Sequence, residues 1–397
     1  MPAKLISFIL LFCLGLGLFI HYQSRAPLRG FSDYRVYHNA GKDILSGKNI
    51  YVRPSEEITP FKYSPLFAVF MAPFAIFDKR ISASLFFLLN LSCLFFSFWL
   101  SSKLIFLDKV AFKQGFWIFV AVLMLSFRAI LHCLDSGQVG LLISFLCLLG
   151  LFYISKSKQL KGSFLISFAG MIKYMPFIFG VYFFLRRKFK IVYLMGLSFL
   201  IYCLIPAVFL GFKTNFTYLK EWIPYITSTS LGRGSFLDPK NHSLWVISQR
   251  LLSCFGAGSF TVLFTVCLFA VAVFLFTFRK KTKNYKINQL CDCADYGMIF
   301  LSTVLFNPNA WLHNYSVLIF PYMLIVYYLF ICNFKDKLVL IFLFFSFILF
   351  SLGSESLVGE KMKIVLENYS LVTWGVLFVF AAIIKIKFFS RVKLIEA

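Results

Sequence analysis

The sequence predicts an all-α polytopic membrane protein, and three observations support this class. Of the 397 residues, 60% are hydrophobic and only 14% are charged, with a mean hydropathy of +0.82. An ordinary soluble domain is roughly half apolar and a quarter charged. The apolar residues form runs of roughly 16–23 residues, long enough to cross a hydrocarbon core of about 30 Å. Lysine and arginine, which give the chain a net charge of +24, gather between these runs, as they do in cytoplasmic loops.

The first run, residues 5–20, resembles a signal peptide. It has no small-x-small cleavage signature and many further runs follow it, so an uncleaved first span is predicted. The other clear spans are predicted at residues 81–100, 116–131, 139–154, 191–211, 259–278, 315–332, 338–352 and 370–386. A shorter run at residues 295–306 is also counted as a span.

The apolar stretch at residues 163–185 contains "MIKYMP" and is predicted to be broken. Basic segments flank it on both sides, "SKSKQLK" and "RRKFK", and both are expected in the cytoplasm. Two short helices meeting at 173–176 satisfy this condition, and Pro176 disfavours helix at the residue before it. Lys173 then lies at the outer surface or in a cavity. It is either a functional cation or a lysine that snorkels to the interface.

This pattern gives a single integral-membrane domain over residues 1–397, with about 12 transmembrane helices and a range of roughly 10–13. Both termini are predicted in the cytoplasm. Two long segments, residues 21–80 and 212–258, are predicted on the outer side and to carry short amphipathic helices. The cytoplasmic loops account for the positive charge, so nucleic acid is not expected as a partner. The pair "CDC" at 291–293 lacks a second pair at zinc-site spacing, and no metal site is predicted.

The first outer segment contains "SDYRVYHNAGKDILSGKNIY", which predicts a helix over residues 33–45 with Gly47 as its stop. Asp33 stands where a helix N-cap is expected, so capping is the alternative to a chemical role. Pro65 and Pro73 are predicted to break the apolar stretch that follows. By this topology, polar residues from four further turns reach the same outer face: Asp135, Gln138, Lys173, Asn241, His242, Ser243, Trp311, His313 and Asn314.

Seven motifs in order resemble glycosyltransferase family 87: D-Y-x-x-Y-x-x-A (33–40), SGKNIY (46–51), YSPLFAVFMAPF (63–74), GQVGLLI (137–143), GMIKYMPFIF (170–179), NHSL (241–244) and NPNAWLHNY (307–315). The resemblance covers nearly the whole chain. Enzymes of this family are GT-C-type membrane proteins similar to the polyprenol-phosphate-mannose-dependent α-mannosyltransferases of bacterial envelopes. The resemblance implies a GT-C-type helical bundle, Asp33 as general base, and His313 as the histidine of the W-x-H motif. Gly140 and Asn314 depart from the family pattern.

The residues fit transfer of a sugar from a lipid phosphate. A carboxylate takes the proton of the acceptor hydroxyl, while cationic and polar groups stabilise the leaving phosphate. The predicted general base is Asp33, and the predicted donor-binding groups are Lys173, His313, Gln138, Asn241 and, more weakly, Arg128. Three tyrosines are predicted to position the acceptor or the loop: Tyr34, Tyr37 and Tyr63. No cofactor and no metal are expected, and a single displacement predicts inversion at the anomeric carbon.

The predicted activity is therefore transfer of a hexose from a polyprenyl-phosphate donor to an envelope glycan or glycolipid acceptor. Mannose is the hexose expected. The active site is expected on the extracytoplasmic side of a bacterial cytoplasmic membrane, with the donor, the acceptor and membrane lipids as partners. One alternative is a lipid-linked glycan transporter or flippase, which would share the spans and the basic loops. The other is a non-catalytic member of the family.

Overall fold

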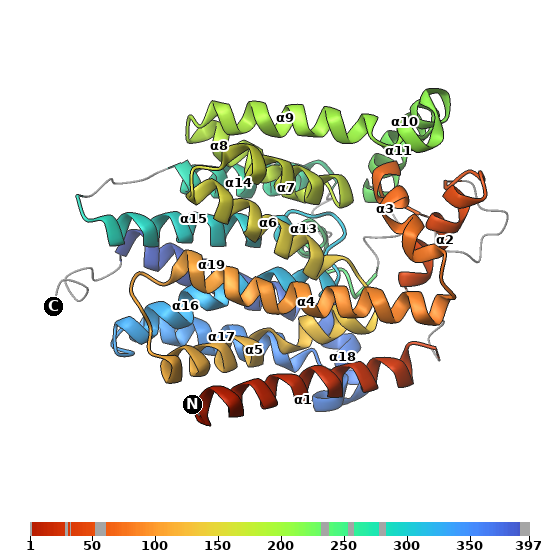
Figure 1. The fold of residues 1–397 in the computed structure, drawn as a ribbon. Coiled ribbons are helices and arrows are strands. Elements are labelled where there is room, and N and C mark those ends of the chain that lie inside the picture. The colour runs from red at the N-terminus through yellow and green to blue at the C-terminus, as the bar shows by residue number, and fades with distance from the viewer. Residues whose placement is uncertain are drawn as a thin grey trace. The chain divides into compact units, whose positions relative to one another are not determined.

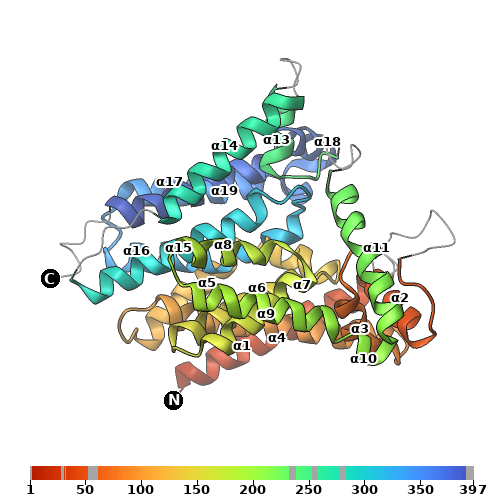
Figure 2. The same ribbon diagram turned by 90° about the horizontal axis from the view of Figure 1, so that it is seen from above.

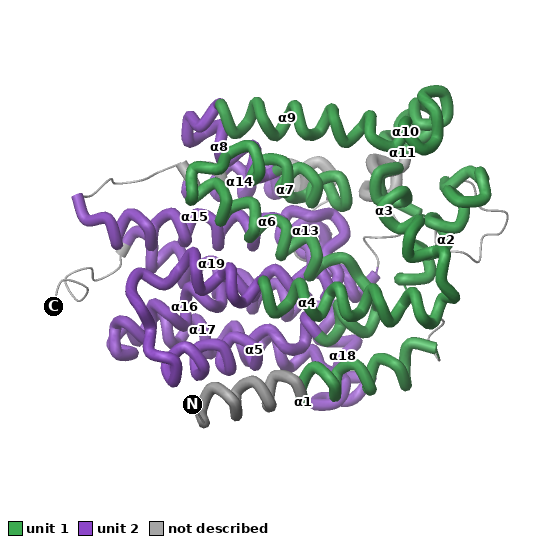
Figure 3. The backbone as a smooth tube through the Cα atoms, in the orientation of Figure 1, with its two compact units in different colours: residues 1–96, 131–177, 190–229 green, residues 97–130, 178–189, 230–397 purple. Residues whose placement is uncertain are grey.

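The computed structural model describes residues 2–27, 31, 33–51, 61–231, 238–252, 258–277 and 283–389, and all regular structure in these ranges is helical (Figure 1). The all-α prediction is confirmed for this part of the chain. The chain divides into two compact units (Figure 3). Unit 1 comprises residues 1–96, 131–177 and 190–229, and unit 2 comprises residues 97–130, 178–189 and 230–397. Parts of both predicted outer segments, residues 52–60, 232–237 and 253–257, lie outside the described residues.

Unit 1 is built mainly from the first half of the chain. Its helices are α1 (Pro2–Arg25), α2 (Tyr34–Leu45), α3 (Pro65–Ala75), most of α4 (Lys79–Ile105), the end of α5 (Phe112–Asp135), α6 (Gly140–Ser155), α7 (Gln159–Ile172), η1 (Met175–Phe177), α9 (Phe189–Leu204), α10 (Ala207–Leu210) and α11 (Phe212–Leu231). Helices α6 and α7 pack together, as do α2 and α3. A buried cluster of Leu66, Met171, Tyr202 and Trp222 joins α3, α7, α9 and α11.

Unit 2 contains the rest of α4 and α5 and the C-terminal helices. These are α8 (Ile178–Leu185), α13 (Leu244–Leu252), α14 (Gly258–Thr277), α15 (Tyr285–Leu305), η3 (Leu312–Leu318), α16 (Ile319–Ile331), α17 (Lys337–Leu352), α18 (Glu355–Asn368) and α19 (Leu371–Phe389). Helix α19 packs along both α17 and α15 (Figure 2). Its burial against two helices explains why its apolar residues continue around most of its surface.

Five helices in the described residues are long and apolar enough to cross a membrane, or six if α17 and α18, bent by 82° at their junction, form one span. Three further apolar helices are shorter: α3, α6 and the η1–α8 stretch from Met175 to Leu185. A polytopic membrane protein is therefore supported. The count of about 12 spans stays a prediction.

The structure bears on two predicted helix breaks, one at residues 173–176 and one in the apolar stretch that became α3. The predicted break is confirmed, because α7 ends at Ile172 and Lys173 has extended backbone (φ −136°, ψ 130°). The break predicted at Pro73 is wrong, because α3 runs through it to Ala75. Pro65 instead begins α3, where its missing N–H is harmless and its fixed φ suits a helix.

Helix α15 begins ten residues earlier than the predicted span at 295–306. The Asn284 side chain starts it by accepting hydrogen bonds from the backbone N–H groups of Lys286 (2.9 Å) and Ile287 (3.3 Å). The acidic residues of α15 are paired inside unit 2. Asp295 lies 2.6 Å from the Lys387 ammonium of α19, and both side chains are buried. Pairing permits such charges inside apolar helices, where an unpaired charge is costly.

The contact between α6 and α7 depends on glycine. A Cβ atom added at Gly162 would lie 2.5 Å from the Gly150 carbonyl oxygen and 2.5 Å from Ile154 Cγ1. Small residues of this kind let membrane helices approach closely. We expect Gly162→Ala to lower the free energy of unfolding by about 1–3 kcal/mol, because the two helices must separate.

Thermal unfolding of the purified protein in detergent measures this effect. Gly196→Ala in α9 is the matched control, because a Cβ there meets no atom within 4 Å. Alanine in an open helix position should be neutral or stabilising. Equal melting temperatures for Gly162→Ala and the control would contradict the close packing.

Candidate active site

Helix α2 presents one apolar face to unit 1 and one polar face away from it. Tyr34, Tyr37 and Gly41 are on the buried face. The Tyr37 ring packs edge-on against Phe67 of α3, with ring centroids 5.2 Å apart. At Gly41 the two helices are so close that a Cβ atom would lie 2.7 Å from the Met71 carbonyl oxygen. The helix predicted over 33–45 is thus confirmed, and its packing fixes the position of its first turn.

Asp33 occupies the N-cap position of α2, but its side chain makes no capping hydrogen bond to that helix. It is partly exposed, and its carbonyl oxygen accepts a hydrogen bond from the Val36 N–H at 3.0 Å. The Asp33 carboxylate therefore does not cap α2, which was the alternative to a chemical role. The carboxylate is placed by the helix and available for another interaction.

The turn after α5 lies against the start of α2. Gly137 has a positive φ of 64°, and a Cβ atom there would lie 2.7 Å from the Tyr34 Cβ. Only glycine combines this backbone conformation with so close an approach. The approach brings Gln138 to Tyr37, whose hydroxyl donates to Gln138 Oε1 at 3.0 Å. The Tyr37 hydroxyl also lies 2.8 Å from that of Tyr63.

Lys173 reaches this cluster from the break after α7. Its ammonium donates to Gln138 Oε1 over 3.4 Å, so Gln138 links Lys173 to Tyr37. Burial lowers the pKa of Lys173 to about 8, and the nearby Asp33 carboxylate opposes this shift. Burial raises the pKa of Tyr63, and the Asp33 carboxylate raises it further. The Asp33 carboxylate thus acts electrostatically on both Tyr63 and Lys173, each of which is joined to Tyr37 directly or through Gln138.

A second cation beside Asp33 was missed by the sequence analysis. Burial lowers the pKa of Lys62, which lies just before α3, and the Asp33 carboxylate opposes this shift. Its position next to Tyr63 in "FKYSP" was the available signal, because Tyr63 was already among the predicted residues. Lys62, Lys173 and Asp33 together carry two positive charges and one negative charge. This combination suits an anionic ligand.

Tyr34, by contrast, is used to hold the fold. It is fully buried, and its hydroxyl is hydrogen-bonded to that of Ser82 at the start of α4. Ser82 in turn donates to the Phe74 carbonyl oxygen at 2.7 Å. This chain of contacts ties α2 to α3 and α4. Tyr34 therefore positions the loop, and the cluster around Asp33 comprises Tyr37, Tyr63, Gln138, Lys62 and Lys173.

The predicted site residues of unit 2 form a separate arrangement. Asn241 joins "NHSL" to the "NPNAW" turn: its Nδ2 donates to the Pro308 carbonyl oxygen (2.8 Å), and its Oδ1 accepts from the Ala310 N–H (3.1 Å). The His242 N–H donates to the Ala310 carbonyl oxygen at 2.8 Å, and the His242 carbonyl oxygen accepts from the Tyr315 hydroxyl at 2.6 Å. These contacts hold the turn that leads into η3.

The contacts of Asn241 predict a measurable structural effect. Asn241→Ala leaves buried backbone groups of the turn without their partners, which costs about 1–3 kcal/mol for each such group. We expect a lower melting temperature and a reduced yield of folded protein, measured by size-exclusion chromatography and thermal unfolding. Ser356→Ala is the control, because Ser356 is exposed. An Asn241→Ala variant with unchanged stability would mean that the turn does not depend on this amide.

His313 lies in the first turn of η3 and is 7% exposed. Arg128 is committed elsewhere in unit 2: it donates to the Phe350 carbonyl oxygen at 2.5 Å and also to the Gly353 carbonyl oxygen, at the end of α17. Cations at helix C-termini are stabilising. This accounts for Arg128 in the fold, and its contact with a phosphate, like that of His313, stays a prediction.

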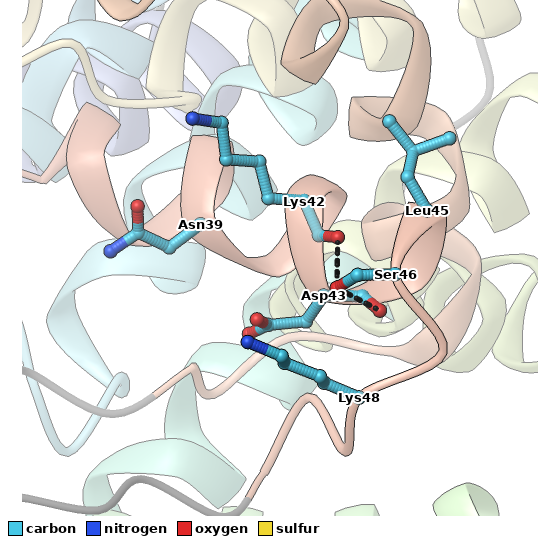
Figure 4. A pocket seen from close by; sticks show the side chains of 6 residues that line it. All are labelled: Asn39, Lys42, Asp43, Leu45, Ser46 and Lys48. Atoms are coloured by element: carbon cyan, nitrogen blue, oxygen red, sulfur yellow. Dashed lines mark hydrogen bonds between the residues drawn. The ribbon is translucent and has the colours of Figure 1, made fainter.

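A pocket of about 470 Å³ opens on the polar face of α2 and the turn after it (Figure 4). It is lined by Asn39, Lys42, Asp43, Leu45, Ser46 and Lys48. The Lys48 ammonium points toward the Asp43 carboxylate, and Ser46 donates to the Lys42 carbonyl oxygen at 2.8 Å. On this 12-residue helix the pocket is on the side opposite Tyr34 and Tyr37. It is therefore separate from the cluster around Asp33.

Comparison with known families agrees with four of the seven motifs, those at residues 63–74, 137–143, 170–179 and 241–244, while the motif that begins at Asp33 lies before the match. Residues 61–294, more than half of the chain, match glycosyltransferase family 87. The match includes Lys62, Tyr63, Gln138 and Lys173 and ends before the turn that carries His313. No curated protein matches the chain. With its apolar spans, its helical fold and this match, the chain belongs to glycosyltransferase family 87, a family of membrane glycosyltransferases.

Proposed function

We propose that this glycosyltransferase moves a hexose from a polyprenyl-phosphate donor to an envelope glycan or glycolipid acceptor. Mannose is the hexose proposed. The reaction takes place at the extracytoplasmic face of a bacterial cytoplasmic membrane, with both termini in the cytoplasm. It needs no metal and no cofactor. The observation that carries the proposal is the Asp33 carboxylate, which does not cap its helix and lies within electrostatic range of the Lys173 ammonium.

The proposed chemistry assigns one role to each charge. Asp33 takes the proton of an acceptor hydroxyl as that oxygen forms a bond to the anomeric carbon. The bond between the anomeric carbon and the phosphate oxygen breaks, and the lipid phosphate leaves with the electron pair. Lys173 stabilises the negative charge that develops on the phosphate. Attack opposite the leaving group converts a β-linked lipid-phosphate sugar into an α-glycoside.

The polar neighbours have supporting roles in this proposal. Gln138 accepts from both Lys173 and Tyr37, so it orients the ammonium relative to α2. Tyr37 and Tyr63 form a hydroxyl pair that lines the acceptor side. His313 is proposed to bind the donor on the strength of its motif. Asn241 is proposed to act on the donor only through the turn that it holds.

Transfer of radiolabelled sugar by the purified protein tests the proposal. The protein is reconstituted in nanodiscs with a panel of polyprenyl-phosphate hexoses and pentoses and a membrane glycolipid extract as acceptor. We expect transfer from the mannosyl donor, a product cleaved by α-mannosidase, and a rate within about twofold after EDTA treatment, because no metal acts as Lewis acid. Loss of activity with EDTA would reject the metal-independent mechanism. Movement of the donor across vesicles without transfer would favour a flippase.

A further inference from the structure

The two predicted outer segments contact each other in unit 1 through polar side chains. Glu221 of α11 accepts hydrogen bonds from Asn49 Nδ2, at 3.2 Å to Oε2 and 3.4 Å to Oε1. One turn earlier on α11, the Tyr218 hydroxyl donates to the Lys48 carbonyl oxygen at 3.0 Å. Tyr218 also packs edge-on against the Tyr51 ring, with ring centroids 5.9 Å apart. Helix α11 therefore holds the segment that follows α2.

Tyr51 extends this contact to Tyr63. Asn49 Oδ1 accepts a hydrogen bond from the Tyr51 N–H at 2.8 Å, so one amide side chain joins Glu221 to the backbone of Tyr51. The Tyr51 hydroxyl donates to the Tyr63 carbonyl oxygen, also at 2.8 Å. The backbone at Tyr63 is thus held from the side of α11.

The side chain of Tyr63 continues the connection. Its hydroxyl lies 2.8 Å from that of Tyr37, and the Tyr37 hydroxyl donates to Gln138 Oε1 at 3.0 Å. A tyrosine hydroxyl has one proton, and Tyr37 gives its proton to Gln138, so Tyr63 must be the donor to Tyr37. Gln138 Oε1 also accepts from the Lys173 ammonium at 3.4 Å. A continuous series of contacts therefore runs from α11 to Lys173, and all of it lies within unit 1.

We propose that Tyr51 is a positioning residue, which uses the support of Glu221 to set the orientation of the Lys173 ammonium toward the donor phosphate. This inference rests on the proposed function and adds the second outer segment to its donor site. Lysine is a point charge on a flexible four-carbon stem and has no fixed geometry of its own toward a phosphate. The groups that hold such a cation therefore set its orientation, as Gln138 holds Lys173.

Removal of the Tyr51 hydroxyl should change how often Lys173 is in its binding orientation. With the contacts intact, the ammonium is oriented before the donor binds. Without that hydroxyl, the backbone at Tyr63 loses one contact, and the side chains of Tyr63, Tyr37 and Gln138 can adopt other arrangements. If the ammonium is in its binding orientation for about a fifth of the time, the apparent dissociation constant for a phosphate rises about fivefold.

Equilibrium binding of farnesyl phosphate tests this inference without any turnover. Dissociation constants are measured with the full-length protein in nanodiscs at neutral pH. Tyr51→Phe removes only the hydroxyl, Glu221→Leu removes the acceptor, and Glu221→Gln keeps an acceptor oxygen while it loses the charge. Tyr51→Phe is also combined with Lys173→Met. Thr217→Val is the control, because the exposed Thr217 hydroxyl donates within α11, at 3.1 Å.

We expect Tyr51→Phe and Glu221→Leu each to bind farnesyl phosphate about fivefold more weakly than the wild type. Glu221→Gln and Thr217→Val should bind it like the wild type. Lys173→Met should bind it about tenfold more weakly. Tyr51→Phe should add no further loss to Lys173→Met, because a residue that acts through the ammonium has no effect once the ammonium is absent. A purely structural role of Tyr51 would weaken binding equally in both backgrounds.

Unchanged binding in Tyr51→Phe or Glu221→Leu, an equal loss from Tyr51→Phe in the Lys173→Met background, a loss in Glu221→Gln as large as that in Glu221→Leu, or no binding by the wild type would each overturn the inference. The sugar-transfer assay separates this result from the proposed function. Wild-type transfer with normal phosphate binding in Tyr51→Phe rejects only the positioning role. Absence of transfer with Tyr51-dependent phosphate binding rejects the proposed function and leaves the connection from α11 to Lys173.

Discussion

Replacement of Asp33 by asparagine is expected to lower kcat by about a hundredfold to ten-thousandfold, the usual contribution of a general base. The amide keeps the shape of the carboxylate but cannot take the acceptor proton. Because the Asp33 side chain makes no capping hydrogen bond, the substitution should leave α2 intact. Initial rates of labelled sugar transfer, measured at saturating donor and acceptor, give the change in kcat.

Asp43→Asn is the matched control for this experiment. Asp43 lies on the same helix but lines the pocket on its polar face. We expect its kcat to stay within about twofold of the wild type and its melting temperature to equal that of Asp33→Asn. An Asp33→Asn variant that retains more than a tenth of the wild-type kcat, a barrier change below about 1.4 kcal/mol, would remove Asp33 from the role of base.

Replacement of Lys173 by methionine is expected to lower kcat/KM for the donor by about a hundredfold to a thousandfold. Loss of one group that stabilises a developing anion typically has an effect of this size. Methionine keeps the apolar stem and removes the charge, so packing in the break after α7 should change little. Competition by farnesyl phosphate should weaken in parallel. Unchanged kcat/KM and unchanged competition would exclude Lys173 from the phosphate site.

The pH dependence of the same parameter gives an independent test. Burial lowers the pKa of Lys173 to about 8. A lysine is charged below its pKa and neutral above it, so the phosphate-binding charge is lost as the pH rises through 8. Because kcat/KM reports on the free enzyme, we expect it to fall about tenfold between pH 8 and pH 9.5.

Lys173→Arg serves as the control for the pH profile. Arginine remains charged across this range, so the decrease above pH 8 should disappear even if the absolute rate is lower. The same alkaline decrease in Lys173→Arg would assign it to another group. The profile therefore distinguishes loss of the Lys173 charge from a general effect of pH on the membrane protein.

The sequence was most informative where the pattern is local. Apolar runs predicted the helical spans, and Pro176 with its flanking basic segments predicted the break at Lys173, which the structure contains. Apolar and aromatic residues at helical spacing, with Gly47 as the stop, predicted α2 nearly to the residue. Each of these signals depends on residues close together in the chain. The match to glycosyltransferase family 87 likewise follows from motifs that can be read in order.

One error, the predicted start of the span at 295–306, came from an interaction between distant residues. Asp295 looked like the edge of a span because its partner, Lys387, is 92 positions away in the chain. The backbone contacts of Arg128 were also not visible in the sequence, because the carbonyl groups that it binds belong to α17, and its role at a phosphate stays a prediction. A charge inside an apolar segment is either functional or paired, and a sequence without its contacts does not separate the two cases.

By itself the sequence determined the class of the protein, its family and the carboxylate at the start of α2, since these depend on composition, order and local spacing. Only the tertiary structure decided which charges surround that carboxylate. Lys173 is far from α2 in the chain, and the packing of the Gly137 turn against Tyr34 brings Gln138 to Tyr37 and so links Lys173 to the helix that begins after Asp33. Electrostatic interaction depends on distance in space, which is set by burial and close packing rather than by position in the sequence.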